Sequence, residues 1–169
     1  MVTRVLTAAD AAAFHQVRRR GLHEEPEAFG MAPEEMSSVE ALARQFKAQA
    51  SGHDAFIMGA FTPDLVGTVG CRREPRVKRR HVALIWGVYV LPEHRGGGLG
   101  RRLLLDTLAR AREWPDLEQL WLDVTATNLA ARTLYLSCGF QIIALRRNTL
   151  KVAGRYYYYD EEMMALDLR

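Results

Sequence analysis

The sequence predicts a mixed α/β fold in which a mostly antiparallel central sheet carries helices on both faces. Apolar residues alternate between strand and helix periods along the chain, in the order β-α-α-(α)-β-β-β-α-β-α-β-β. Three consecutive strands lead into a single β-α-β crossover, which favours a mixed sheet. A doubly wound sheet would repeat the β-α-β unit, and this chain offers only one clear example.

The N-terminal third is predicted to contain one strand followed by helices. Residues 2–6 form a short apolar strand, and residues 7–22 form a helix that opens with a capping-box pattern. Residues 24–30 (E-E-P-E-A-F-G) predict a break and a short helical turn. A further helix is expected to begin near Ser37 and to end by Gly52.

A hairpin and a basic run follow. Residues 54–61 and 65–71 are predicted strands, joined through a turn that contains Pro63 and Asp64. Six of the nine residues from Arg72 to Arg80 (R-R-E-P-R-V-K-R-R) are basic. We interpret this run as the solvated end of a hairpin, and it is also the place to look for contact with an acidic partner.

One stretch, residues 85–102 (I-W-G-V-Y-V-L-P-E-H-R-G-G-G-L-G-R-R), organises the rest of the chain. It begins as a buried strand, and a helical apolar stripe starts at Gly100. The glycines between them let backbone N–H groups approach a bulky anion, and the helix start adds unpaired N–H groups. With Arg95, Arg101 and Arg102 nearby, the pattern predicts a phosphate or pyrophosphate site. The alternative is a loop whose glycines only make the turn.

The C-terminal half is predicted to be a strand, a helix and further strands. Residues 118–125 alternate, with Leu120, Leu122 and Val124 on one face, and a helix follows Asn128 and ends at Gly139. Further strands are predicted over residues 140–145, 149–152, 155–160 and 163–168.

Length and composition indicate one globular domain over residues 1–169. Hydrophobic residues make up 49% and charged residues 25%, and the net charge of +3 is too small by itself to imply nucleic-acid binding. Cys71 and Cys138 lack metal or redox spacing and are interpreted as small hydrophobes in a reducing cytosol. There is no apolar run of membrane-spanning length and no signal-peptide pattern. We therefore expect a cytoplasmic protein with no metal, nucleic-acid or membrane partner.

The glycine spacing distinguishes between phosphate-binding loops. A Walker loop requires Lys and Ser/Thr after its last glycine, and neither follows Gly100. The dinucleotide fingerprint can start at Gly98, but its third glycine position holds Leu103. Asp123, an acid after the next strand, is the remaining feature that favours a Rossmann-type site, and this alternative is weak. The pattern R-x-x-G-x-G, which begins at Arg95 and is preceded by V-x-V-x-P, resembles the cofactor loop of the GNAT acetyltransferase superfamily.

The resemblance extends to a second motif, N-x-x-A-x-x-x-Y-x-x-x-G-F, from Asn128 to Phe140. It implies that Tyr135 lies near the thioester sulfur of acetyl-CoA and serves as general acid for the departing thiolate. The helix pattern alone favours the alternative that Tyr135 is a core aromatic with a hydrogen-bonded hydroxyl. The resemblance also implies a splayed strand whose backbone pairs with pantetheine. The implied cofactor-binding residues are Val88, Tyr89, Val90, Arg95, Gly96, Gly97, Gly98, Leu99, Gly100, Arg101, Asn128 and Ala131.

The chemistry implied by this resemblance is direct transfer, in which a primary amine of a small molecule, peptide or protein attacks the thioester within a ternary complex. The amine must be neutral, which requires a general base. Some relatives place a Glu on the strand that corresponds to residues 81–88, but this segment has no acid. The candidate bases are Glu24, Glu25, Glu27, Asp160, Glu161 and Glu162.

The tyrosines at 156–159 resemble an extended form of a G-R-Y-Y-D-E stretch found in some members of the superfamily. In strand geometry two of them face each side, where one pair either lines an acceptor pocket or covers the sheet. The expected function is an acetyl-CoA-dependent N-acetyltransferase. The alternatives are a non-catalytic acyl-CoA-binding module and, less favoured, a Rossmann-type dinucleotide-binding protein. Dimers are frequent in the superfamily, so a homodimer is a possible assembly, although no residue pattern identifies an interface.

Overall fold

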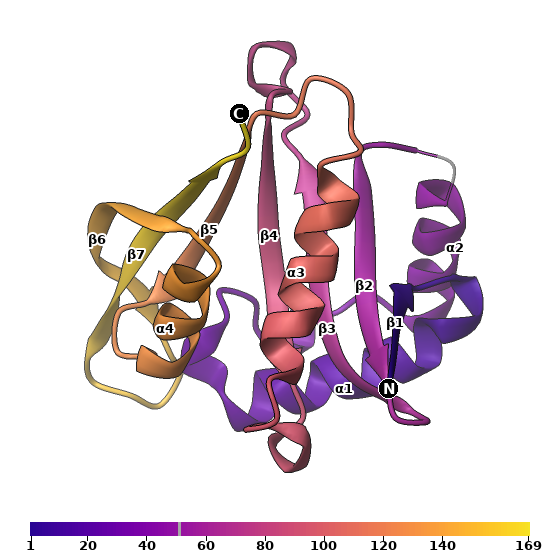
Figure 1. Ribbon diagram of the computed structural model, residues 1–169. Helices are drawn as coiled ribbons and strands as arrows, with labels where there is room; N and C mark the ends of the chain where they lie inside the picture. Colours follow the sequence, from indigo (N-terminus) through magenta and orange to yellow (C-terminus); the bar gives the residue numbers. More distant parts are fainter. Residues whose placement is uncertain (51) are drawn as a thin grey trace.

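The computed structural model describes residues 1–50 and 52–169 and shows a seven-stranded sheet in the order β1-β2-β3-β4-β5-β7-β6 (Figure 1). Neighbouring strands are antiparallel except β4 and β5, which run parallel. The predicted mixed, mostly antiparallel sheet is confirmed. The strands are β1 (Val2–Val5), β2 (Ala55–Phe61), β3 (Leu65–Arg73), β4 (Val82–Val90), β5 (Gln119–Thr125), β6 (Gln141–Lys151) and β7 (Tyr158–Asp167).

Four α-helices pack on the two faces of the sheet in the described residues (Figure 1). α1 (Ala11–Glu24) and α2 (Val39–Gln49) cover one face, while α3 (Leu99–Ala111) and α4 (Leu129–Ser137) cover the other. Each face has its own hydrophobic core, because the strand side chains alternate between the two faces. None of the helices in the described part of the chain is both long and apolar enough to span a bilayer.

Helix ends follow the predicted signals with one correction. The side chain of Ser38, rather than Ser37, caps α2 by accepting a hydrogen bond from the Ala41 N–H. Asn128 caps α4 in the same way, through the Ala131 N–H, and Gly139 follows with a φ of 94°. The sequence contains two consecutive serines before α2, and only the backbone trajectory decides which of them reaches the helix end.

The C-terminal strands differ from the prediction. Instead of four short strands, β6 and β7 form one long antiparallel pair. Register shifts interrupt β6, and within one of them Asn148 adopts a φ of 55°. The predicted strand ended at residue 145, but the pairing with β7 resumes beyond Asn148 at Leu150.

The basic run after β3 is mostly solvated, with specific exceptions. Arg73 is buried, and its guanidinium donates hydrogen bonds to the carbonyl oxygens of Arg80 and Pro115. Arg80 forms an ion pair with Asp54. Two of the six basic residues therefore hold the hairpin in place, whereas Arg72 is the one exposed residue of β3.

The parallel pair β4–β5 is the irregular part of the sheet. Residues 82–84 pair with residues 119–121, and beyond this short ladder the two strands separate. At the same level the β3–β4 register shifts opposite Val69, where Gly87 has a φ of 61°. The expected splay is therefore present, and a glycine-based β-bulge accompanies it.

The first strand is joined to α1 through a buried carboxylate. Asp10 accepts hydrogen bonds from both Nη atoms of Arg4, at 2.7 and 2.8 Å, and from the backbone N–H of Thr7 at 2.8 Å. The hydrogen bonds from Arg4, with those from Thr7, lower the pKa of Asp10 to about 2. The carboxylate is only 11% exposed, so this ion pair is partly protected from water.

We predict that Asp10→Asn lowers the free energy of unfolding at pH 7 by on the order of 2 kcal/mol, the value of a pKa lowered from 3.8 to about 2. Because the folded-state pKa lies below the unfolded one, this stability is present above pH 4 and is lost as pH falls toward 2. Urea unfolding at pH 7 and pH 3 checks it, with the exposed turn residue Asp64→Asn as control. A pH-independent difference between Asp10→Asn and the native protein would contradict it.

Candidate active site

The glycine-rich turn between β4 and α3 is open and left-handed at two positions. Gly96 and Gly98 have φ values of 83° and 76°, which favour glycine. A side-chain carbon built on either residue, or on Gly97, would meet no atom within 4 Å. α3 begins at Leu99, so the turn delivers the unpaired N–H groups of the first helical turn to this open space. The geometry suits a phosphate group.

Arg95 ties this turn to the end of β4. Its Nε donates to the Val90 carbonyl oxygen at 2.8 Å, and its Nη1 lies 2.7 Å from a Glu25 carboxylate oxygen. The guanidinium also lies 5.4 Å from the centre of the Tyr89 ring. Glu25 balances much of its charge, so Arg95 acts here mainly as a tether that positions the glycines.

Beyond its short ladder with β5, the edge of β4 presents free backbone groups to the gap between these two strands. The Leu91 N–H donates to the Val66 carbonyl on the β3 side. Because successive peptide groups of a strand point to opposite sides, Val88 and Val90 direct theirs toward the gap left by β5. Arg95 already occupies the Val90 carbonyl, which leaves the Val90 N–H and both polar groups of Val88 available.

These features surround one cavity of about 310 Å³ on the α3–α4 side of the sheet. Eleven of the twelve residues predicted to bind the cofactor line it, and Gly97 does not. Arg102 also lies outside the lining, because it pairs with Asp106 one turn further along α3. The predicted residues in the lining are Val88, Tyr89, Val90, Arg95, Gly96, Gly98, Leu99, Gly100, Arg101, Asn128 and Ala131.

Tyr135 lines the same cavity from α4. Its side chain is 6% exposed, and its ring packs edge-on against Phe140 at a centroid distance of 6.1 Å. Burial alone raises the pKa of the hydroxyl, and neither a hydrogen bond nor a charge contributes to the shift. The hydroxyl therefore stays protonated at neutral pH. It makes no side-chain hydrogen bond within residues 1–50 and 52–169, in contrast to an ordinary core tyrosine.

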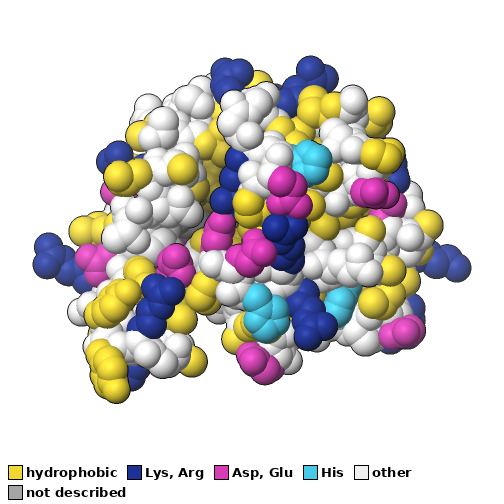
Figure 2. Space-filling view, turned by 90° about the horizontal axis from the view of Figure 1, so that it is seen from below, with side chains coloured by type: hydrophobic (Ala, Val, Ile, Leu, Met, Phe, Trp, Pro, Cys, Tyr) yellow, Lys and Arg dark blue, Asp and Glu magenta, His cyan; other side chains and the backbone are white. Residues whose placement is uncertain are grey.

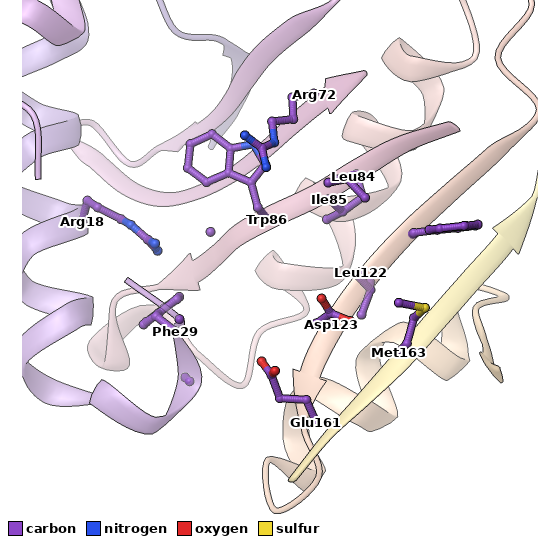
Figure 3. A pocket seen from close by; sticks show the side chains of 14 residues that line it. Arg18, Phe29, Arg72, Leu84, Ile85, Trp86, Leu122, Asp123, Glu161 and Met163 are labelled. Carbon is purple, nitrogen blue, oxygen red and sulfur yellow. The ribbon is translucent and has the colours of Figure 1, made fainter. Parts of the chain in front are cut away.

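A second cavity of about 290 Å³ lies on the α1–α2 side of the same gap (Figure 3). Its lining ends on β4 at Gly87, and the lining of the first cavity begins at Val88. The outward face of β5 contributes Trp121 and Asp123, and the segment after α1 contributes Phe29. The two cavities thus lie on opposite faces of the sheet and border each other on β4, between Gly87 and Val88. Figure 2 shows the molecule from below the view of Figure 1, with a hollow that has acidic and basic side chains beside it.

The six candidate bases are distributed over both cavities and the surface. Glu161 lines the second cavity, and Glu25 lines the first one in its ion pair with Arg95. Glu24 accepts hydrogen bonds from Arg20 and the Tyr89 hydroxyl, while Glu162 accepts one from Arg132. The remaining two are Glu27, beside Arg155, and Asp160, which accepts the Asn148 N–H. These two, like Glu24 and Glu162, lie outside both linings.

The tyrosine run does not line an acceptor pocket. β7 begins only at Tyr158, so the expected strand alternation over residues 156–159 is wrong. Tyr156 is fully exposed, and the rings of Tyr157 and Tyr159 lie 5.2 Å apart beside Arg155. None of the four tyrosines belongs to either cavity lining.

Sequence reasoning missed three residues of the second cavity. Arg18 lies one helical turn after the buried Phe14 on the inner stripe of α1, and a charge at such a position was the available signal. Gly87 and Trp86 were treated only as strand residues. Neither the bulge at Gly87 nor the position of the Trp86 ring over Gly70 has a local sequence signal.

Comparison with known proteins identifies the family of this chain. The model of the acetyltransferase (GNAT) family matches residues 17–140. The chain therefore belongs to the GNAT family, as the two sequence motifs predicted.

The sequence of this chain aligns with only part of each individual relative. The N-alpha-acetyltransferase RimI of Mycobacterium tuberculosis is 35% identical over 109 residues, which cover 64% of this chain and 66% of that protein. The ribosomal protein bS18-alanine N-acetyltransferase of Salmonella typhimurium is 41% identical over 86 residues, 51% and 56% of the two chains. The chain thus spans less than two thirds of these relatives.

A solved structure shares the whole fold. A putative acetyltransferase from Salmonella typhimurium, solved with its cofactor acetyl-CoA, superimposes with a TM-score of 0.85 at 23% identity and covers 100% of this chain and 94% of that one. At this identity the likeness concerns the fold.

We predict that Gly87→Ala lowers the free energy of unfolding by about 1–2 kcal/mol, because alanine is strained at a φ of 61°. The matched control is Gly30→Ala in the same cavity, where an added carbon meets nothing within 4 Å, so a change below about 0.5 kcal/mol is expected. Urea denaturation measures both. Equal stability of the two variants would show that the bulge is not under this constraint.

Proposed function

We propose that this protein is an acetyl-CoA-dependent N-acetyltransferase that transfers the acetyl group directly to a primary amine. The observation that carries the proposal is the convergence of the glycine turn, the free edge of β4 and the uncommitted Tyr135 hydroxyl on one cavity. The relatives named above as N-acetyltransferases support the same reaction class.

Acetyl-CoA supplies an activated acetyl thioester. The turn at Gly96 and Gly98, with the first N–H groups of α3, fits its pyrophosphate, and Arg101 adds a charge in the lining. The free groups of Val88 and Val90 fit the amides of the pantetheine arm as an added strand would. Among the described residues, no strand pairs with the Val88 N–H and C=O or with the Val90 N–H on the β5 side.

The second cavity is the proposed acceptor site, because it opens at the same gap from the opposite face. Overall, a nitrogen–carbon bond replaces the carbon–sulfur bond, so the amine loses one proton and the sulfur gains one. Of the six acids considered, Glu161 is the one in the acceptor cavity, where Asp123 accompanies it, so these two carboxylates are proposed to accept the amine proton. Tyr135 is proposed to donate the proton to sulfur, and the Val88 N–H to stabilise charge on the carbonyl oxygen.

A non-catalytic acyl-CoA-binding module is the main rival. Such a module needs the glycine turn and the β4 edge but neither a buried protonated hydroxyl nor a second cavity beside the gap. The presence of both features favours catalysis. A dinucleotide-binding protein is not supported, because the sheet contains only one parallel pair among its described strands.

We predict that Gly98→Glu abolishes acetyl-CoA binding, because a carboxylate would occupy the proposed pyrophosphate site. The matched control is Gly154→Glu, which places the same residue at a similar φ of 77°, also with open space around it, but in the β6–β7 connection. Calorimetric titration with acetyl-CoA measures both. Unchanged affinity in Gly98→Glu would disprove the loop assignment.

We predict that Tyr135→Phe lowers kcat roughly 10- to 100-fold while acetyl-CoA affinity changes little, since only the proton donor is removed and the contact with Phe140 is kept. Steady-state thiol release and calorimetry separate the two effects. Tyr157→Phe, outside both cavities, is the control. Equal turnover would show that solvent or another group protonates the thiolate.

A further inference from the structure

Arg18 is a buried cation without an anionic partner in the described part of the chain. It projects from α1 and is 6% exposed, and its Nη1 atom has no hydrogen-bond partner within residues 1–50 and 52–169. Its guanidinium lies 4.4 Å from the centre of the Phe29 ring and 6.0 Å from that of Trp86. Desolvation is the sole cause that lowers its pKa, to about 10, so no carboxylate compensates for its burial.

This arrangement is costly unless a ligand completes it. Most buried arginines donate their N–H groups to carboxylates or carbonyls, as Arg73 does in this chain. Two aromatic rings offset part of the desolvation of Arg18 but accept no conventional hydrogen bond. The Nε1 of Trp86 is a second buried donor without a partner among the described residues. Both side chains line the proposed acceptor cavity, so two neighbouring donors there lack an acceptor.

The charges of the cavity are separated. In Figure 3 the Arg18 guanidinium points inward from one side, and the carboxylates of Asp123 and Glu161 point inward from the other. Arg72 adds a further basic residue to the lining. Arg146, which is not part of the lining, pairs with both acids, with its Nη2 2.6 Å from Asp123 and 3.5 Å from Glu161. A zwitterion matches this distribution better than a simple alkylamine does.

We propose that the acceptor is a small amine that also carries a carboxylate or another small oxyanion, as an α-amino acid does. The Arg18 guanidinium, with the Trp86 indole N–H beside it, binds the oxyanion. The amino group lies toward Asp123 and Glu161. This inference rests on the proposed function and narrows its acceptor to a chemical class.

The test compares the standard L-amino acids with their C-terminal amides at saturating acetyl-CoA, by thiol release. At least one acid should exceed its own amide in kcat/KM by roughly 10- to 100-fold, the value of a charge-assisted hydrogen bond. An aminoalkylphosphonate of matched length distinguishes a carboxylate-specific site from a general oxyanion site. Amides used as well as acids, or a tripeptide amide used better than any free amino acid, would overturn the proposal.

The variant Arg18→Met removes the charge and keeps much of the volume. It should reduce the preference for acid over amide to about 2-fold or less, mainly through KM, and Arg18→Lys should restore part of it. Acetyl-CoA affinity should not change, because Arg18 does not line the cofactor cavity. A preference that survives in Arg18→Met would overturn the assignment, since a purely structural arginine would leave the ratio unaltered.

Direct binding keeps this inference separate from the proposed function. Calorimetric titration of the native protein with the same acids and amides requires no turnover. Binding of an acid, but not its amide, with no acetyl transfer would support the oxyanion site and contradict the transferase. Acetyl transfer to amines, with no preference for acids over amides in either assay, would support the transferase and contradict the oxyanion site.

Discussion

The site depends on one interruption of backbone hydrogen bonding. β4 and β5 form the only parallel pair among the described strands, and their ladder ends at Leu84 and Trp121. Beyond that point β4 keeps its partner β3 on one side and has free peptide groups on the other. Buried or half-buried peptide groups need partners, so a separated strand edge inside a sheet is a ready binding surface for an extended amide-containing chain.

The surrounding residues keep this edge open and connect it to both faces. The bulge at Gly87 turns the strand beside the gap, and Arg95 fixes the turn that follows it by binding the last strand carbonyl. Donor and acceptor would then approach the opening from opposite faces of the sheet, which suits direct transfer within a ternary complex. The two cavities also differ in how their charges are arranged. In the cofactor cavity Glu25 is paired with Arg95, and Arg101 adds a further positive charge. In the acceptor cavity Arg18 lies across from Asp123 and Glu161.

The sequence was most informative where functional residues lie within short sequence motifs. The glycine turn follows from its spacing, while Asn128 and Tyr135 were identified by the resemblance of residues 128–140 to the second GNAT motif. The structure brings all three to one cavity. Arg18 and Trp86 were not predicted, because their roles depend on contacts between α1, β3 and β4 that lie far apart in sequence. The β6–β7 pair was predicted as shorter pieces, whereas tertiary pairing continues past the register shift between Arg146 and Leu150.

Hydrogen exchange of the backbone amides at Val88 and Val90, with and without acetyl-CoA, tests the central claim most directly. Both N–H groups face the gap, so pantetheine paired with this edge must slow their exchange. The account predicts protection of residues 88–90 and of the first turn of α3 by acetyl-CoA, and none by NAD at the same concentration. Saturating acetyl-CoA that leaves these amides unprotected, or equal protection by NAD, would contradict the claim that the separated strand edge holds the acyl donor.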